Sequence, residues 1–283
     1  MIYEPIIKAH QKKFKEAYNL VKDSEDQVFE KFVNYSELLQ HQPDVFSSDL
    51  EFLDLVCVGG GNDAGLDGVA IKVNGFFIKS QEEIDEFLKT GSIDIEFIFI
   101  QSKNKKNFES ECISSFINGV RAFFDNESQY PFNDNVLFWR NLKDYLYEED
   151  VILQWKGSPM VRCYYVTLGD LRPHIEHEDL IRQFKKDMMD ICDNVPFIFQ
   201  GAKEFKDVIK VDDSVTLGEY NVFRNKIFLT KDFNPTTLYH ELLHMASNPY
   251  DNTNNFGGFF YTIGKYKIGY GLDEGYTELL NKR

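Results

Sequence analysis

The sequence predicts an α/β fold in which a mixed sheet is flanked by helices. Short apolar segments alternate with longer segments whose apolar residues recur at helical spacing, the pattern of a sheet covered by helices. Hydrophobic residues make up 43% of the chain and aromatic residues 15%, which is enough to build a packed core and argues against disorder. A length of 283 residues suits one large domain or two smaller ones.

The first predicted elements are two helices. Residues 1–22 are rich in Lys and Glu. A second helix is predicted from Ser24, because Ser24 and Gln27 have the spacing of a capping box and the residues after them are apolar at helical intervals. The pattern changes after Pro43, and the apolar run 52–58 predicts a strand.

The later elements follow the same alternation up to a charged segment. The pair Asn74-Gly75 between apolar runs is a strong hairpin signal. Strands are predicted at 69–73, 76–78, 93–100, 161–167 and 196–199, helices at 80–90, 108–124 and 176–192, and helix with loop at 126–160.

A domain boundary is predicted within residues 203–214, where the chain becomes charged and loses its periodicity. The predicted domains are therefore 1–205 and 206–283. The second begins with a strand at 226–230 and continues with a helix, a loop rich in Gly and Asn, and a final short helix.

The net charge of -15 makes a general nucleic-acid coat protein improbable, because phosphate contacts need Lys and Arg. It does not exclude a nuclease with a local basic patch. No apolar run has the length of a membrane span and no signal peptide is evident, so we expect a cytoplasmic protein that does not enter membranes. The four dispersed cysteines are expected to be reduced core thiols. The oligomeric state is left open, a homo-oligomer included.

The segment 59–103 combines residues suited to phosphodiester hydrolysis. A glycine-rich turn leads to Asp67 before one strand, and a later strand ends in Gln101 and Lys103, whose i, i+2 spacing places them on one side of a sheet. Asp67 and the amide oxygen of Gln101 are suited to bind Mg²⁺. Lys103 is suited to orient or deprotonate a water and to stabilise charge on the phosphate.

Each of these features alone is more often an ordinary hairpin or a solvated charge run. Together and in this order they resemble the PD-(D/E)xK nucleases, in the branch with Gln in place of the acid. The turn at 58–63, Asp67-Gly68 and the strand end 99–103 are similar to Mrr-type enzymes and closer still to the N-terminal domain of abortive-infection phage-resistance (AIPR) proteins, over about residues 20–205.

The resemblance implies a restriction-endonuclease-like mixed sheet, a Mg²⁺ or Mn²⁺ cofactor and a DNA or RNA substrate. It also implies a further acid from the first part of the domain, and Glu30 is the matching position. Gln101 is a departure, because it removes one negative charge and lowers the expected metal affinity unless Glu30 contributes.

The second domain contains the sequence His-Glu-Leu-Leu-His at 240–244. On a helix, His240 and His244 project from one face and suit a zinc ion, and Glu241 beside them suits a general base. The alternative is a surface helix with two ordinary histidines. Asn234-Pro235 before the motif suits a helix start.

A catalytic zinc needs a third protein ligand and an open position for water. Glu274 is the preferred ligand and Glu278 the alternative, while Asp273 is expected to cap the last helix. Tyr261 and Tyr270 are candidate oxyanion donors.

Residues 220–283 resemble the gluzincin metallopeptidases, although the segment is short for such a domain. The resemblance implies a protein or peptide substrate, which would add as an extra strand along 226–230.

Three functions follow from these two patterns. The first is an antiviral-defence effector in which a nuclease is combined with a zinc peptidase that cleaves a partner protein or the chain itself. The second is a peptidase with an inactive nuclease fold used for binding, which the net charge and Gln101 favour. The third is a nuclease with a structural zinc site.

Overall fold

The chain divides into two compact units. In the computed structural model the first unit is Met1–Phe46 with Leu50–Lys210, and the second is Ser47–Asp49 with Val211–Arg283. No helix among the described residues is long and apolar enough to cross a membrane. The structure describes residues 3–42, 45–46, 50–170, 175–209, 218–221, 226–229, 242–243, 256–257, 260–263 and 266–268.

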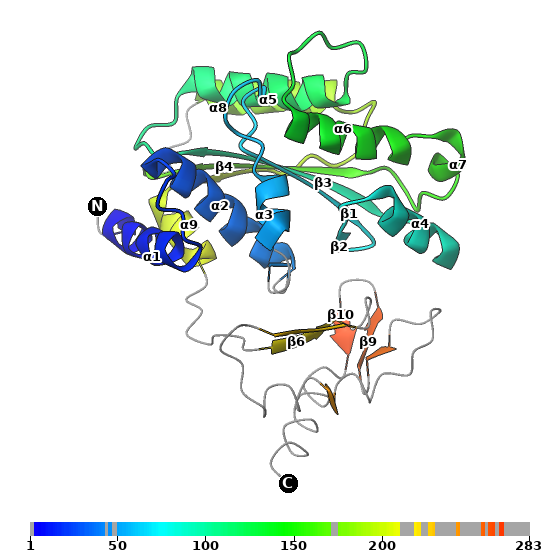
Figure 1. The fold of residues 1–283 in the computed structure, drawn as a ribbon. Coiled ribbons are helices and arrows are strands. Elements are labelled where there is room, and N and C mark those ends of the chain that lie inside the picture. Colours follow the sequence, from blue (N-terminus) through cyan, green and yellow to red (C-terminus); the bar gives the residue numbers. More distant parts are fainter. Residues whose placement is uncertain are drawn as a thin grey trace. The chain divides into compact units, whose positions relative to one another are not determined.

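The first unit is built on a five-stranded mixed sheet in the order β2-β1-β3-β4-β5 (Figure 1). β1 is antiparallel to β2 and β3, whereas β3, β4 and β5 are parallel to one another. The strands are β1 (Gly68–Val73), β2 (Phe76–Phe77), β3 (Ile95–Lys103), β4 (Met160–Thr167) and β5 (Phe197–Gln200). This confirms the predicted mixed sheet flanked by helices.

Helices cover both faces of the sheet (Figure 1). α2 packs on one face, where His41 contacts Tyr164, together with α1 and α9. α5 and α8 pack on the other, where Phe123 contacts Phe97 and Phe99. The helices are α1 (Tyr3–Ala17), α2 (Glu25–His41), α3 (Leu50–Val56), α4 (Gln81–Thr90), α5 (Ser110–Phe124), α6 (Asp134–Leu146), α7 (Glu149–Ile152), α8 (Ile175–Asp187) and α9 (Ala202–Val208).

Local sequence signals explain where several elements begin and turn. α2 starts with the predicted capping box, in which the hydroxyl of Ser24 accepts from the backbone N–H of Gln27 and the Gln27 side chain accepts from Ser24 N–H. The β1–β2 turn has positive φ at Asn74 and at Gly75, which suits these two residue types. The strand β1 is buried along its whole length because helices lie on both faces.

The strand predicted at 52–58 was wrong, because the chain forms α3 there. Phe52, Leu53 and Val56 are the buried positions of α3, and their i, i+1, i+4 spacing is that of a helix face. A short apolar run can form either a buried strand or a helix of about two turns, and the sequence pattern alone does not decide between them. Packing decides the outcome here, since Phe52 contacts Trp139 and Phe77.

The second unit contains two small antiparallel sheets. β6 (Gly218–Asn221) pairs with β7 (Lys226–Leu229), and β7 agrees with the strand predicted at 226–230. The predicted loop rich in Gly and Asn contains three strands instead: β8 (Phe256–Gly257), β9 (Phe260–Ile263) and β10 (Tyr266–Ile268).

Glu37 is a carboxylic acid inside the first unit, between α2 and the sheet. It is 1% exposed, and its Oε1 has no hydrogen-bond partner in the part of the chain that the structure describes. Burial raises the pKa of Glu37 to about 8, although a hydrogen bond with Gln200 of β5 opposes the rise. Tyr164 of β4 also interacts electrostatically with it.

We expect the stability gained by Glu37→Gln over the wild type to grow with pH. Folded protein keeps the Glu37 proton up to about pH 8, whereas unfolded chains release it near pH 4.5, so the wild type loses stability as pH rises through this window. Chemical denaturation at pH 5 and pH 8 should show a gain larger at pH 8 by on the order of a few kcal/mol. Glu111→Gln, at an exposed position, is the control. Equal stability gains of Glu37→Gln at pH 5 and pH 8 would contradict the expectation.

Candidate metal centre of the first unit

The structure brings Asp67, Gln101 and Lys103 to one face of the sheet. The last paired residues of β1 and β3 are Gly68 and Ile100, so Asp67 lies opposite Gln101 one position further along. The backbone N–H of Asp67 donates to the carbonyl of Ile100 at 2.9 Å, which continues the pairing. Because residues at i and i+2 of a strand share a face, Lys103 lies on the same side as Gln101.

The carboxylate of Asp67 is held through one of its oxygens. Oδ2 accepts hydrogen bonds from Gln101 Nε2 at 2.5 Å, from Ser102 N at 2.7 Å and from Ser102 Oγ at 3.0 Å. These three donors orient the carboxylate. They also place the amide nitrogen of Gln101, rather than its oxygen, toward Asp67, so metal ligation by Gln101 would require the amide to rotate.

The glycine-rich turn before Asp67 is organised by Asp63. Its carboxylate accepts from the backbone N–H groups of Gly60 and Gly61, both at 3.1 Å, and of Gly65 at 2.8 Å. The glycines have positive φ values, which L side chains rarely adopt. Asp63 therefore shapes the loop that delivers Asp67 to the sheet.

The side chain of Glu30, on α2, lies next to the glycine-rich turn that precedes Asp67. Its carboxylate packs against Gly59, where a Cβ atom would lie only 2.2 Å from Glu30 Oε1. A side chain at position 59 would therefore push the Glu30 carboxylate away from the turn. Glu30 is thus adjacent to the turn, as the resemblance implied for the additional acid.

Burial and mutual repulsion change the acidity of the two carboxylates. Burial raises the pKa of Glu30, and the negative charges of Asp67 and Asp63 raise it further, against the effects of Lys103 and the Gly59 N–H. Burial also raises the pKa of Asp67, whereas Lys103 and the two donors of Ser102 lower it. A cation bound here would relieve this repulsion and displace protons.

These residues fit a hard divalent cation. Two carboxylates and an amide offer oxygen ligands of the kind that Mg²⁺ and Mn²⁺ prefer. Within the described ranges no three His, Cys, Asp or Glu side chains gather where they could hold a metal ion, so a site here would depend on Gln101, water or substrate for further ligands.

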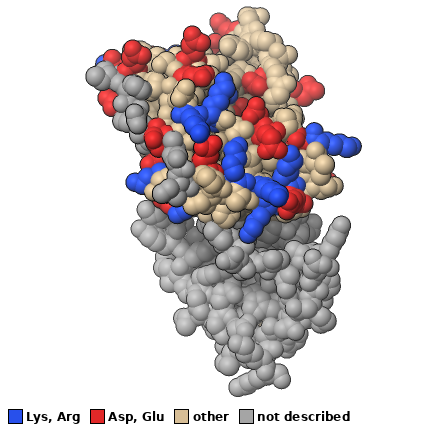
Figure 2. All heavy atoms as spheres, turned by 90° about the vertical axis from the view of Figure 1, so that its left-hand side faces the viewer, with Lys and Arg blue, Asp and Glu red and all other residues tan. Residues whose placement is uncertain are grey.

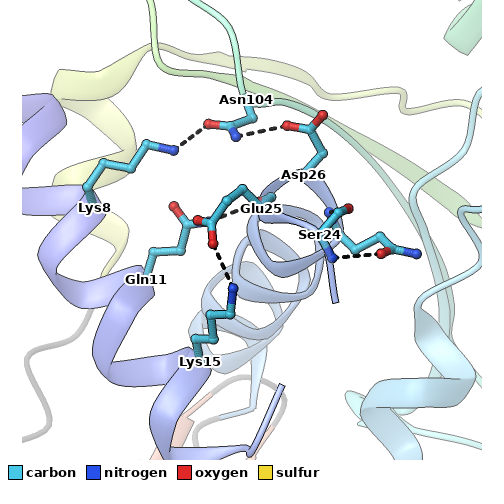
Figure 3. Close-up of polar contacts among 8 residues, drawn as sticks. Lys8, Gln11, Lys15, Ser24, Glu25, Asp26 and Asn104 are labelled. Carbon is cyan, nitrogen blue, oxygen red and sulfur yellow. Dashed lines mark hydrogen bonds and ion pairs between the residues drawn. The ribbon is translucent and has the colours of Figure 1, made fainter. Parts of the chain in front are cut away.

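The loop after Lys103 is fixed to two helices (Figure 3). Asn104 accepts from Lys8 Nζ of α1 at 2.5 Å through Oδ1, and its Nδ2 donates to Asp26 of α2 at 2.9 Å. Lys106 forms an ion pair with Glu4 of α1 at 2.9 Å. The backbone that carries Lys103 out of β3 is therefore restrained immediately beyond it.

Charges of both signs are interleaved on this side of the first unit (Figure 2). Several lysines here have carboxylate partners, and such pairs contribute little to stability and can exchange partners. The pairs are Lys12–Glu16, Lys15–Glu25, Lys105–Glu109 and Lys106–Glu4. The surface is therefore not a broad basic field.

The predicted zinc residues lie outside the described residues. These are His240, Glu241, His244 and Glu274, with Glu278 as the alternative ligand; the expected helix cap Asp273 and the candidate oxyanion donor Tyr270 lie outside them too. Leu242 and Leu243 are helical, and Leu242 is 44% exposed. Tyr261 belongs to β9.

Two residues at the candidate centre were missed by the sequence reasoning. Ser102, between Gln101 and Lys103, donates twice to Asp67. Asn34 lies one helical turn after Glu30 and donates to the Asp67 carbonyl. The i, i+4 spacing of Glu30 and Asn34 was the available signal for Asn34.

Searches against known protein families, curated proteins and solved structures found no match. The resemblances drawn from the motif residues thus remain proposals.

We expect Gln101→Glu to lower the melting temperature without metal and to enlarge the increase caused by Mn²⁺. The new carboxylate would replace a donor to Asp67 with a like charge, at a cost of about 1–3 kcal/mol. A bound cation would turn that repulsion into ligation and stabilise the fold by mass action. Thermal unfolding with and without MnCl₂ measures both effects.

The exposed substitution Gln129→Glu is the control for added charge. If Gln101→Glu melts at the wild-type temperature without metal and gains no more from Mn²⁺ than the wild type, residues 67 and 101 do not form a cation site.

Proposed function

We propose that residues 1–205 form a metal-dependent nuclease of the PD-(D/E)xK type with a restriction-endonuclease-like sheet. The observation that carries this proposal is the convergence of Asp67, Gln101 and Lys103 on one face of the sheet, with Glu30 adjacent to the turn. The order of these residues along the chain and their elements match the chemistry of phosphodiester hydrolysis.

In this proposal Asp67, Gln101 and Glu30 would hold Mg²⁺ or Mn²⁺. The ion supplies charge stabilisation on the phosphate and a water of lowered pKa. Lys103 would orient that water or, as the neutral amine, accept its proton, and in its charged form it would stabilise the phosphate oxygens. Ser102 keeps the Asp67 carboxylate oriented through its two hydrogen bonds.

We further propose that residues 206–283 form a zinc metallopeptidase of gluzincin type. His240, His244 and Glu274 would hold Zn²⁺, with Glu241 as the general base that takes a proton from water and passes it to the leaving amine. The support for this part is the sequence alone. A partner protein or the chain itself would be the substrate, and a cytoplasmic role in antiviral defence is suggested by the AIPR resemblance alone.

One alternative has specific support. Gln101 stands beside Asp67 where the resembled nucleases have an acid, and the lysines beside the site are paired with acids. Both features favour a first unit that binds a partner without cleaving nucleic acid. The next two experiments separate these functions.

We expect Lys103→Ala to reduce cleavage of DNA or RNA by about 10²-fold or more in the presence of Mg²⁺ or Mn²⁺, because it removes the group that handles the proton at the water. Lys105→Ala removes an exposed neighbouring charge and should retain wild-type cleavage. Release of nucleotides from labelled duplex and single-stranded substrates is the measurement. Wild-type protein that cleaves none of them with either metal would select the binding alternative.

Glu241→Gln should abolish proteolysis, including self-cleavage, while leaving zinc content at one ion per chain. The amide cannot accept the proton of water, whereas the histidines still bind metal. His240→Ala should lose the zinc as well. Undiminished proteolysis by Glu241→Gln would contradict the peptidase proposal, and zinc closed by four protein ligands would indicate a structural site.

A further inference from the structure

Asn34 connects α2 to both ends of the loop that delivers Asp67. The side chain is fully buried, and its Nδ2 donates to the carbonyl of Asp67 at 3.0 Å and to Sγ of Cys57 at 3.2 Å. Cys57 and Gly68 form an isolated β-bridge, so the loop between them closes at the position of Asn34. The carbonyl of Asp67 also accepts from the N–H of Val58 at 3.1 Å.

The Asn34 amide packs closely against the backbone of Gly68. A Cβ atom on Gly68 would lie 2.3 Å from Oδ1 of Asn34. Asn34 Oδ1 is itself buried, with no hydrogen-bond partner in the described part of the chain. A buried acceptor without a partner is unfavourable, so the position is not explained by stability alone.

We propose that Asn34 is a positioning residue that sets the backbone of Asp67, so that its carboxylate meets the donors of Ser102 and Gln101 in the orientation required to bind a divalent cation. The inference rests on the proposed nuclease function. Asn34 fixes the main chain of Asp67 from α2, while Ser102 fixes its side chain from β3. Groups that orient metal ligands in this way typically change metal affinity by about 10- to 100-fold when removed.

The test compares Asn34→Leu with Asn135→Leu in the full-length protein. Leu has the size of Asn but donates no hydrogen bond. Asn135 donates to the Cys57 carbonyl at 3.1 Å, so its substitution loosens the same loop without touching Asp67. Calorimetry should show Mn²⁺ binding at least about tenfold weaker in Asn34→Leu and unchanged in Asn135→Leu. Asn34→Ala, which is smaller and donates no hydrogen bond, is the second variant if Asn34→Leu does not fold, and the same loss is expected.

A crystal structure of the Asn34 variant supplies a readout that does not depend on metal or activity. In the variant, the Asp67 carboxylate should no longer accept the hydrogen bond from Ser102 N, which measures 2.7 Å in the wild type. An unmoved Asp67 together with wild-type Mn²⁺ affinity overturns the inference. If the wild type binds no Mn²⁺, the proposed nuclease function fails, and the position of Asp67 in the variant still decides the role of Asn34.

Discussion

The close approach of α2 to the loop between Cys57 and Gly68 is the contact on which the candidate centre depends. Glu30 and Asn34, one helical turn apart, pack so closely against Gly59 and Gly68 that a Cβ atom at either glycine would displace their polar ends. If α2 lay further from the loop by the width of a methyl group, Glu30 would no longer contact the turn. Asn34 would then no longer donate a hydrogen bond to the Asp67 carbonyl. The two glycines therefore allow a helix on one face of the sheet to reach residues at its edge.

The sheet supplies the second half of the arrangement. The pairing of β3 with β1 and β4 determines which residues at the end of β3 face Asp67, and the aromatic contacts of Phe97 and Phe99 with α5 hold that register against a slip. A slip by one residue would exchange Ser102 with Gln101 and reverse the face of Lys103. The site thus depends on the core beneath it, and its polar residues follow the apolar part of β3 directly.

Local signals in the sequence predicted much of the first unit. The capping box at Ser24, the Asn74-Gly75 turn and the apolar strands specify structure through neighbouring residues alone, and the i, i+2 spacing placed Gln101 and Lys103 on one side. Residues 52–58 were predicted to form a strand, but most of them form α3. The helix is favoured by contacts of Phe52 with Trp139 and Phe77, which are distant in sequence. The orientation of the Gln101 amide was unpredictable for the same reason, whereas the i, i+4 spacing of Glu30 and Asn34 was a signal that went unused. The chemistry proposed for His240 and Glu241 stays a prediction from sequence.

The most direct measurement for the central claim is the location of Mn²⁺ by anomalous diffraction from crystals of the protein grown with that ion. We predict a peak about 2 Å from an oxygen of Asp67, with Glu30 or its bound water as a second ligand. No peak at Asp67, with its carboxylate still bonded only to Ser102 and Gln101, would contradict the assignment of a metal centre to this edge of the sheet.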